Sequence, residues 1–265
     1  MAEKKVVSAS ESTRRKRPAA AASSEEGGRK YVASKDQGSA TGKRVVAVIL
    51  WVLAIACEVF AILIATKKLE ITFMNSLVAI VALIVIDLAL VIAGSLLWKK
   101  ANRIDPASEK NKVGFWIWNN MGLIVAVAAF LPFIILTLTN KKADKNTKIV
   151  AVAVGAIALV IGVLVGHEWN PLSAEQKAEQ EGIYADAVLP EQAVYYTQFG
   201  KKYHLYKACQ HINDSDTVYE AKVGSVDGKS AVDLALEDGC SDVCKTCANK
   251  FADERGITPS PAAAE

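Results

Sequence analysis

Four long apolar stretches constrain this chain more than any other feature. They cover residues 45–66, 71–98, 113–140 and 149–166. The hydrocarbon core of a bilayer is about 30 Å thick, so a helix needs roughly 20 apolar residues to cross it. Only helices and closed barrels satisfy their backbone in lipid, and these stretches lack the alternation of barrel strands. We therefore expect an α-helical protein of the cell membrane with four transmembrane helices, in contact with the lipid bilayer, over residues 45–166.

The segments on either side of the apolar region carry opposite charge. Residues 1–44 hold eleven Lys/Arg against five Asp/Glu and are rich in Ala, Ser and Gly, so we predict a disordered basic tail. Residues 170–265 hold nine basic and sixteen acidic side chains, and we expect residues 252–265 to be disordered. Nucleic acids are bound by neutralising phosphates with Lys and Arg. The acidic tail therefore argues against a nucleic-acid partner.

Lys and Arg near the membrane ends indicate the orientation of the helices. The amino-terminal flank carries four such residues (Lys30, Lys35, Lys43 and Arg44), and the first loop carries two. The second loop carries five and the third loop four. This moderate bias places the amino terminus and the second loop in the cytoplasm. With four spans, the carboxyl-terminal tail is then also expected in the cytoplasm.

Two carboxyl side chains, Glu58 and Asp87, are the only charges in the predicted spans. An ionisable group in mid-membrane costs about 2.5–3.5 kcal/mol on insertion scales, so it normally faces protein or a water cavity. Counted from the predicted helix ends at 1.5 Å per residue, the two depths differ by roughly 10 Å, and the side chains need not meet. The alternatives are a neutral carboxyl hydrogen-bonded across the bundle, or a group used in transport or proton relay.

Small residues recur every four positions on the fourth predicted helix, at Ala158, Gly162 and Gly166. Rows of this kind let helix backbones approach closely. Packing within the bundle is the first interpretation, and a homodimer through the fourth helix is the second. Four tryptophans lie near the span ends, where interfacial aromatic residues are common: Trp98, Trp116, Trp118 and Trp169.

The tail reads as a linker followed by a small α+β domain. Residues 167–193 are mostly polar and predict the linker, with a helix-like segment at 173–182. Two aromatic-rich runs flank Gly200 and predict a β-hairpin. A short strand is expected at 218–223. Ser230 and Asp233 match the start of a capped helix, and Gly239 matches its end.

Four of the five cysteines and two of the three histidines lie between residues 204 and 247. Cys-x2-Cys, preceded at a distance by a His/Cys pair, is the spacing of a structural zinc site. A domain of about 60 residues has a thin core, and a metal ion can supply the missing stability. Tetrahedral zinc takes four ligands. The first choice is His204, Cys209, Cys244 and Cys247, with Cys240 and His211 as alternates, either of which could replace His204.

Two other interpretations of the cysteines remain open. Disulfides would require an oxidising compartment and therefore an inverted topology. A thioredoxin-like redox role for Cys244 and Cys247 is weaker, because no βαβ pattern surrounds them.

The tail also resembles a known family. Gly200-Lys201-Lys202-Tyr203-His204, then Cys209, then Gly239 and Cys244-x2-Cys247 are similar to a small bacterial zinc-binding module found as a tail on membrane proteins and on some secreted nucleases. The resemblance covers residues 194–251. It implies a zinc-ribbon-like fold in which the His and three Cys bind Zn²⁺. This chain lacks the proline of the usual ending and has Cys240 in addition.

No catalytic domain accompanies the tail, and no catalytic triad or phosphate loop stands out, so we expect no enzymatic activity. The first functional hypothesis is a membrane scaffold or sensor whose tail binds an unidentified protein partner. The alternative is a small transporter or channel subunit that uses Glu58 and Asp87.

Overall fold

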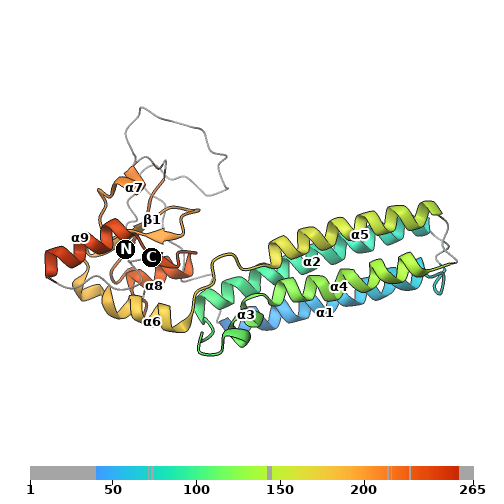
Figure 1. Cartoon of the computed structure of the whole chain (residues 1–265), viewed down its shortest axis with the longest axis horizontal. Coiled ribbons are helices and arrows are strands. Elements are labelled where there is room, and N and C mark those ends of the chain that lie inside the picture. Colours follow the sequence, from blue (N-terminus) through green and yellow to red (C-terminus); the bar gives the residue numbers. More distant parts are fainter. Residues whose placement is uncertain are drawn as a thin grey trace. The chain divides into compact units, whose positions relative to one another are not determined.

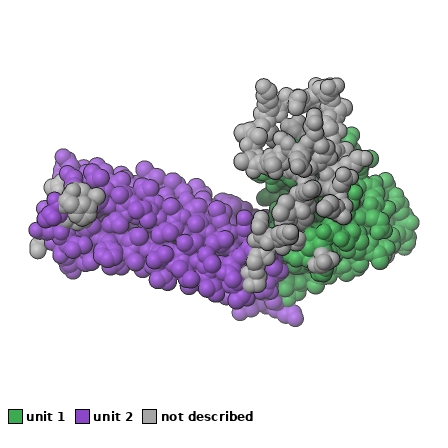
Figure 2. Space-filling view, turned by 180° about the vertical axis from the view of Figure 1, so that it is seen from behind, with its two compact units in different colours: residues 1–37, 172–265 green, residues 38–171 purple. Residues whose placement is uncertain are grey.

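The computed structural model describes residues 40–70, 72, 75–141, 145–213, 215, 217–226 and 228–256. These residues form two compact units, one ending at Pro171 and one starting at Leu172, which we call the helical unit and the tail unit (Figure 2). Most of both predicted disordered tails, residues 1–39 and 257–265, lies outside the described residues. Residues 40–44 and 252–255 belong to helices and not to those tails.

Four helices of the helical unit are long and apolar enough to cross a membrane. They are α1 (Ala40–Ala65), α2 (Ser76–Ile104), α4 (Met121–Thr139) and α5 (Lys145–Gly166), and they lie side by side (Figure 1). Their buried faces share an apolar core made mainly of Ala, Ile and Phe side chains. The large apolar residues on the outward faces are exposed, as lipid contact requires. The prediction of four apolar helices is thus confirmed.

The third span is shorter than the sequence predicts, because the helix breaks at Asn120. A separate helix α3 (Lys112–Asn119) precedes α4. The Asn119 side chain donates to the Phe115 carbonyl, and the Asn120 side chain donates to the Trp116 carbonyl, both at 2.9 Å. Asn side chains compete with the backbone for hydrogen bonds in this way and weaken a helix. The exposed Trp116 is therefore on a short helix before the span, where an interfacial aromatic residue is expected.

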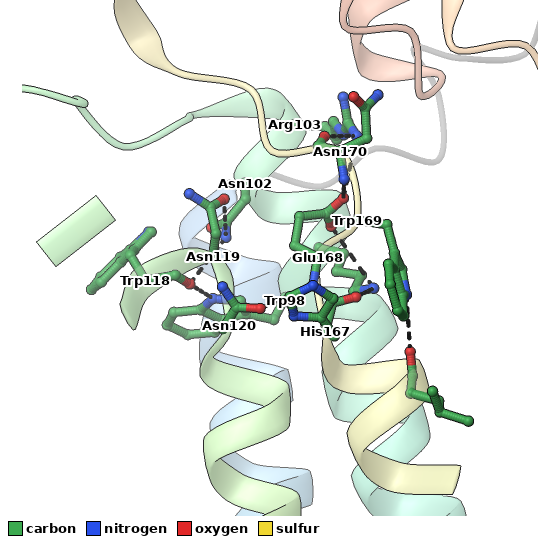
Figure 3. Close-up of polar contacts among 12 residues, drawn as sticks. Trp98, Asn102, Arg103, Trp118, Asn119, Asn120, His167, Glu168, Trp169 and Asn170 are labelled. Carbon is green, nitrogen blue, oxygen red and sulfur yellow. Dashed lines mark hydrogen bonds and ion pairs between the residues drawn. The ribbon is translucent and has the colours of Figure 1, made fainter. Parts of the chain in front are cut away.

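Polar side chains tie α2 to the end of α5 (Figure 3). Lys99 Nζ donates to the His167 carbonyl at 2.6 Å, and Arg103 donates to the Asn170 carbonyl at 2.6 Å. Arg103 and Lys99 also lie 3.5 and 3.9 Å from the Glu168 carboxylate. The carboxyl ends of α2 and α5 are therefore at the same end of the helical unit.

The same end receives the start of α1 and the start of α3 and α4. Arg44 forms an ion pair with Asp105 at 2.7 Å, and its guanidinium lies over the Trp118 ring. Trp98 Nε1 donates to the Trp118 carbonyl at 2.8 Å (Figure 3). We call this end of the helical unit the polar end. The chain enters and leaves the bundle at the polar end, as an even number of spans requires.

The small-residue row of α5 packs against α4 of the same chain. A Cβ atom at Gly162 would lie 2.9 Å from the Ala126 Cβ, and one at Gly166 would overlap the Gly122 backbone. Ala158 is buried as well. The row therefore serves packing within the bundle, and a homodimer through the fourth helix stays a hypothesis that needs another face of α5.

Two small sheets organise the tail unit. Strand β1 (Ala193–Tyr196) is antiparallel to β3 (Tyr219–Lys222), and β2 (Lys202–Tyr203) is parallel to β4 (Asp242–Val243). The helices are α6 (Ala174–Ile183), the 3₁₀ turn η1 (Asp186–Val188), α7 (Gln210–Asn213), α8 (Ala231–Glu237) and α9 (Lys245–Arg255). A small strand-containing region thus follows the membrane helices, as predicted.

The predicted hairpin is present only as one antiparallel bridge, between Tyr195 and His204, because β1 and β2 pair mainly with other strands. Tyr195 and His204 exchange two backbone hydrogen bonds of 2.8 and 2.7 Å. In the turn, Gly200 N donates to the Thr197 carbonyl, and a Cβ at Gly200 would lie 2.5 Å from Thr197 Oγ1. A larger residue at position 200 would therefore require the Thr197 side chain to move.

Most of the predicted linker is folded. Helix α6 begins with a capping box in which Ser173 and Gln176 satisfy each other's backbone N–H. Leu172, Tyr184 and Leu189 are buried in the apolar core of the tail unit. These buried residues are widely spaced in a polar segment, so the sequence shows no helical periodicity that would reveal their role. The folded tail starts at Leu172 and not at residue 194.

Candidate metal centre

Four buried side chains of the tail unit converge on one point. The ligand atoms of His204, Cys209, Cys244 and Cys247 all lie within 4.8 Å of one another. Each residue is at most 6% exposed. The group could hold a metal ion, and it consists of the four ligands that cysteine and histidine spacing selects first.

The β2–β4 pairing brings the two halves of this group together. Tyr203 pairs with Val243, so the next residue on each strand, His204 and Cys244, lies side by side. Cys244 N donates to the Tyr203 carbonyl at 2.8 Å, which extends the ladder to this level. Residues separated by 40 positions in sequence thereby supply adjacent ligands.

Cys209 and Cys247 come from local turns. Cys209 N donates to the Tyr206 carbonyl, and the Cys209 carbonyl accepts from Ile212 N at the start of α7. Cys244 is the N-cap of α9, which places Cys247 in its first turn. The amino end of a helix stabilises negative charge, so it favours thiolates at these two positions.

The spacing of the four ligand atoms matches a tetrahedral ion. Zinc bonds of about 2.3 Å to sulfur and 2.0–2.1 Å to nitrogen imply edges of about 3.8 Å between sulfurs and about 3.6 Å between sulfur and nitrogen. Cys209 Sγ lies 4.0 Å from Cys244 Sγ. His204 Nδ1 lies 3.3 Å from Cys209 Sγ and 3.8 Å from Cys247 Sγ. These three distances lie close to the expected edges, and the remaining pairs lie within 4.8 Å, so the four residues are suited to a tetrahedral ion.

The cysteines are not joined to each other. All five are free thiols in the structure, and 4.0 Å between sulfurs is about twice the length of a disulfide bond. The arrangement is that of a ligand cluster and not of a disulfide pair.

Burial makes charged forms costly at this site unless a cation compensates them. It raises the pKa of the Cys247 thiol to about 12. Burial, and then the positive charges of His211 and Lys202, lower the pKa of His204 to about 4. The imidazole is thus neutral at pH 7, the form that binds a metal, while thiolates need a bound cation to form.

The two alternate ligands lie outside the cluster. Cys240 is buried, but its Sγ donates to the Gly200 carbonyl at 3.7 Å. His211 is exposed, and its Nε2 is 3.1 Å from Thr246 Oγ1. The geometry therefore favours His204 as the fourth ligand.

Glu58 and Asp87 lie within about one helical turn of each other along the helical unit, closer than the depth difference expected from the sequence. A Cβ at Gly94 of α2 would lie 2.5 Å from Trp51 Nε1 of α1, so these two positions face each other. Glu58 lies seven residues after Trp51 on α1, and Asp87 lies seven residues before Gly94 on the antiparallel helix α2. Seven residues are two helical turns, so the same faces meet again at the carboxyls. The two groups are close enough to interact electrostatically. The sequence does not reveal this, because the turn between the helices is longer than predicted.

The polar contacts that join the helices at the polar end were not predicted from the sequence, although the sequence contains a signal for them. Asn119 and Asn120 interrupt an apolar stretch, and Glu168 follows the last span directly. Asn120 Oδ1 accepts from the Glu168 backbone N–H at 3.1 Å (Figure 3).

No family model, no curated protein and no solved structure matches this chain.

Proposed function

We propose that this chain is a non-enzymatic integral membrane protein whose tail unit is a zinc-ribbon-like module stabilised by one structural Zn²⁺. The observation that carries the proposal is the buried cluster of one histidine and three cysteines. Three thiolates and an imidazole are the donors that zinc prefers, and they would complete its tetrahedral coordination. Catalytic zinc keeps an open position for water or substrate, whereas these four protein ligands would close the site.

The chain purified from reduced cells in detergent should contain one Zn²⁺ per polypeptide, measured by elemental analysis. Cobalt(II) in place of zinc should give the absorption of a tetrahedral thiolate complex. Mild acid or a chelator should release the ion and unfold the tail unit together, because thiolates must be deprotonated to bind. A chain that is folded by hydrogen exchange but holds no metal would refute the proposal.

A structural zinc module is a compact support for a binding surface, so we propose that the tail serves as a scaffold or sensor that binds another protein. Chemical crosslinking of the full chain in membranes should give a defined adduct, and Cys247→Ser should lose it. An adduct that is unchanged when zinc is removed would show that binding of the partner does not depend on the metal.

We further propose that both termini lie in the cytoplasm, on the membrane side that the polar end faces. Support comes from the Lys and Arg residues that gather there: Arg44, Lys99, Lys100, Arg103, Lys110 and Lys112. An engineered thiol at Gln198→Cys should escape an impermeant maleimide in intact cells and react after lysis. The matched control, Lys68→Cys in the first loop, should react in intact cells. The opposite labelling pattern would show that the topology is inverted relative to this proposal.

A second candidate is a small transporter or channel subunit. The observation in its favour is the pair of buried carboxyls Glu58 and Asp87 in the apolar core of the helical unit. The full chain in sealed vesicles should then dissipate an ion gradient, and Glu58→Gln with Asp87→Asn should abolish this flux. Equal flux with and without the substitutions would reject the candidate.

A further inference from the structure

The level of Glu58 and Asp87 can be followed around all four long helices. Helices α1 and α4 are in contact at their ends, where Asn140 Nδ2 at the C-cap of α4 donates to the Ala65 carbonyl of α1 at 2.8 Å. Seven residues earlier on both helices, the two are again in contact. There Phe133 N donates to Glu58 Oε1 at 3.3 Å. Helix α5 is at this level too, since a Cβ at Gly155 would lie 3.0 Å from the Phe133 ring.

Helices α2 and α5 place Asp87 in the same part of the bundle. A Cβ at Gly122 would overlap Ser95 Oγ and lie 3.1 Å from Gly166 Cα, so Ser95 of α2 and Gly166 of α5 lie side by side. Eight residues back along both helices are Asp87 and Ala158, about one helical turn from Gly155. One layer of the bundle, about one turn thick, therefore contains Glu58, Asp87, Phe133 and Gly155, about 10 Å inside the end of α1 at 1.5 Å per residue. We call it the carboxyl layer.

Both acids are buried, and Asp87 is unsatisfied. Glu58 is 6% exposed and Asp87 is 1% exposed. Neither oxygen of Asp87 has a hydrogen-bond partner among the described residues. Around them the core is apolar, with Ala54 and Ala61 on α1 and Ile84 on α2. Burial without a partner makes a second negative charge in this layer costly.

The described spans supply no positive charge to balance the acids. α1 beyond Arg44, α2 before Lys99, and α4 contain no Lys or Arg. On α5 the nearest cation is Lys148, seven residues from Gly155, and it donates to the Leu138 carbonyl at the far end. Cys57 is the other titratable group that interacts with Asp87, and it carries no positive charge. Phe133 and Gly155, which complete the layer, do not titrate.

From this geometry we propose that Glu58 and Asp87 form one intramembrane proton-binding site. A proton bound by either acid converts two carboxylates into one acid and one carboxylate, and the net charge of the pair falls from −2 to −1. The Phe133 N–H donates to Glu58. Two carboxyls that interact in a poorly solvated site cannot both ionise readily, so they take up a proton as a pair. The inference deepens the transport candidate by naming the ion, but binding does not require transport.

Infrared spectroscopy of the full chain in vesicles tests the site directly. At pH 7 the native chain should show the C=O stretch of a protonated carboxylic acid, shifted in D₂O. Glu58→Gln and Asp87→Asn together should remove the band while leaving helix content unchanged by circular dichroism. The matched control is Glu70→Gln, which removes an exposed carboxyl and should keep the band.

Three outcomes would overturn the proposal. The band could be absent from the native chain at pH 7, a result that does not depend on how any variant folds. It could persist in the double variant, or it could appear only after sodium and potassium are removed, which would assign the site to a metal cation. A native band without proton flux in vesicles would reject transport and leave the binding site intact.

Discussion

Replacing Cys247 by serine should abolish stoichiometric zinc binding and unfold the tail unit. Cys247 lies in the first turn of α9, and its thiolate would supply one of four bonds to a closed site. The free energy of binding a structural zinc ion is about 10–16 kcal/mol in small peptides, and it is folding free energy. Zinc content after dialysis should fall from one per chain to near zero. Hydrogen exchange should show loss of protection over 172–256 and unchanged protection in the membrane helices.

The matched control is Cys240→Ser, since Cys240 is equally buried but lies outside the four-ligand group, with its Sγ donating to the Gly200 carbonyl. It should retain one zinc per chain. If Cys240→Ser loses the ion and His204→Ala keeps it, the fourth ligand has been assigned wrongly, although the metal site itself would stand.

Gly162→Leu should destabilise the helical unit. Even a methyl group at this position would lie 2.9 Å from the Ala126 Cβ and 3.4 Å from the Phe130 ring, so a leucine must push α5 away from α4. Overpacking of this kind costs about 1–3 kcal/mol and sometimes more. Thermal unfolding of the detergent-solubilised chain should begin several degrees lower than in the native chain.

The control for Gly162→Leu is Val160→Leu, which enlarges an outward, 57% exposed side chain of the same helix. Its unfolding temperature should be unchanged. Equal stability of both variants would show that α4 and α5 do not pack closely at this row. Loss of a dimer with unchanged monomer stability would point to association through α5.

Much of the metal cluster could be predicted because its information is local. Cys244 and Cys247 have the spacing of one helical turn at a helix start, and Cys209 follows His204 after a short turn. The choice between His204, Cys240 and His211 could not be made from spacing, since all three lie within reach in sequence. The β2–β4 ladder decides it by placing His204 beside Cys244.

The apolar segments alone determined that this chain has four helices fit for a membrane, because the bilayer imposes length and hydrophobicity on each span separately. What only the tertiary structure decided is which residues meet across helices. Glu58 and Asp87 share a layer because the contact between Trp51 and Gly94 sets the register of α1 against α2. Likewise, Leu172 and Tyr184 belong to the core of the tail unit because they pack against residues that are distant in sequence. Register and packing depend on shape complementarity between distant segments, and local composition carries no record of it.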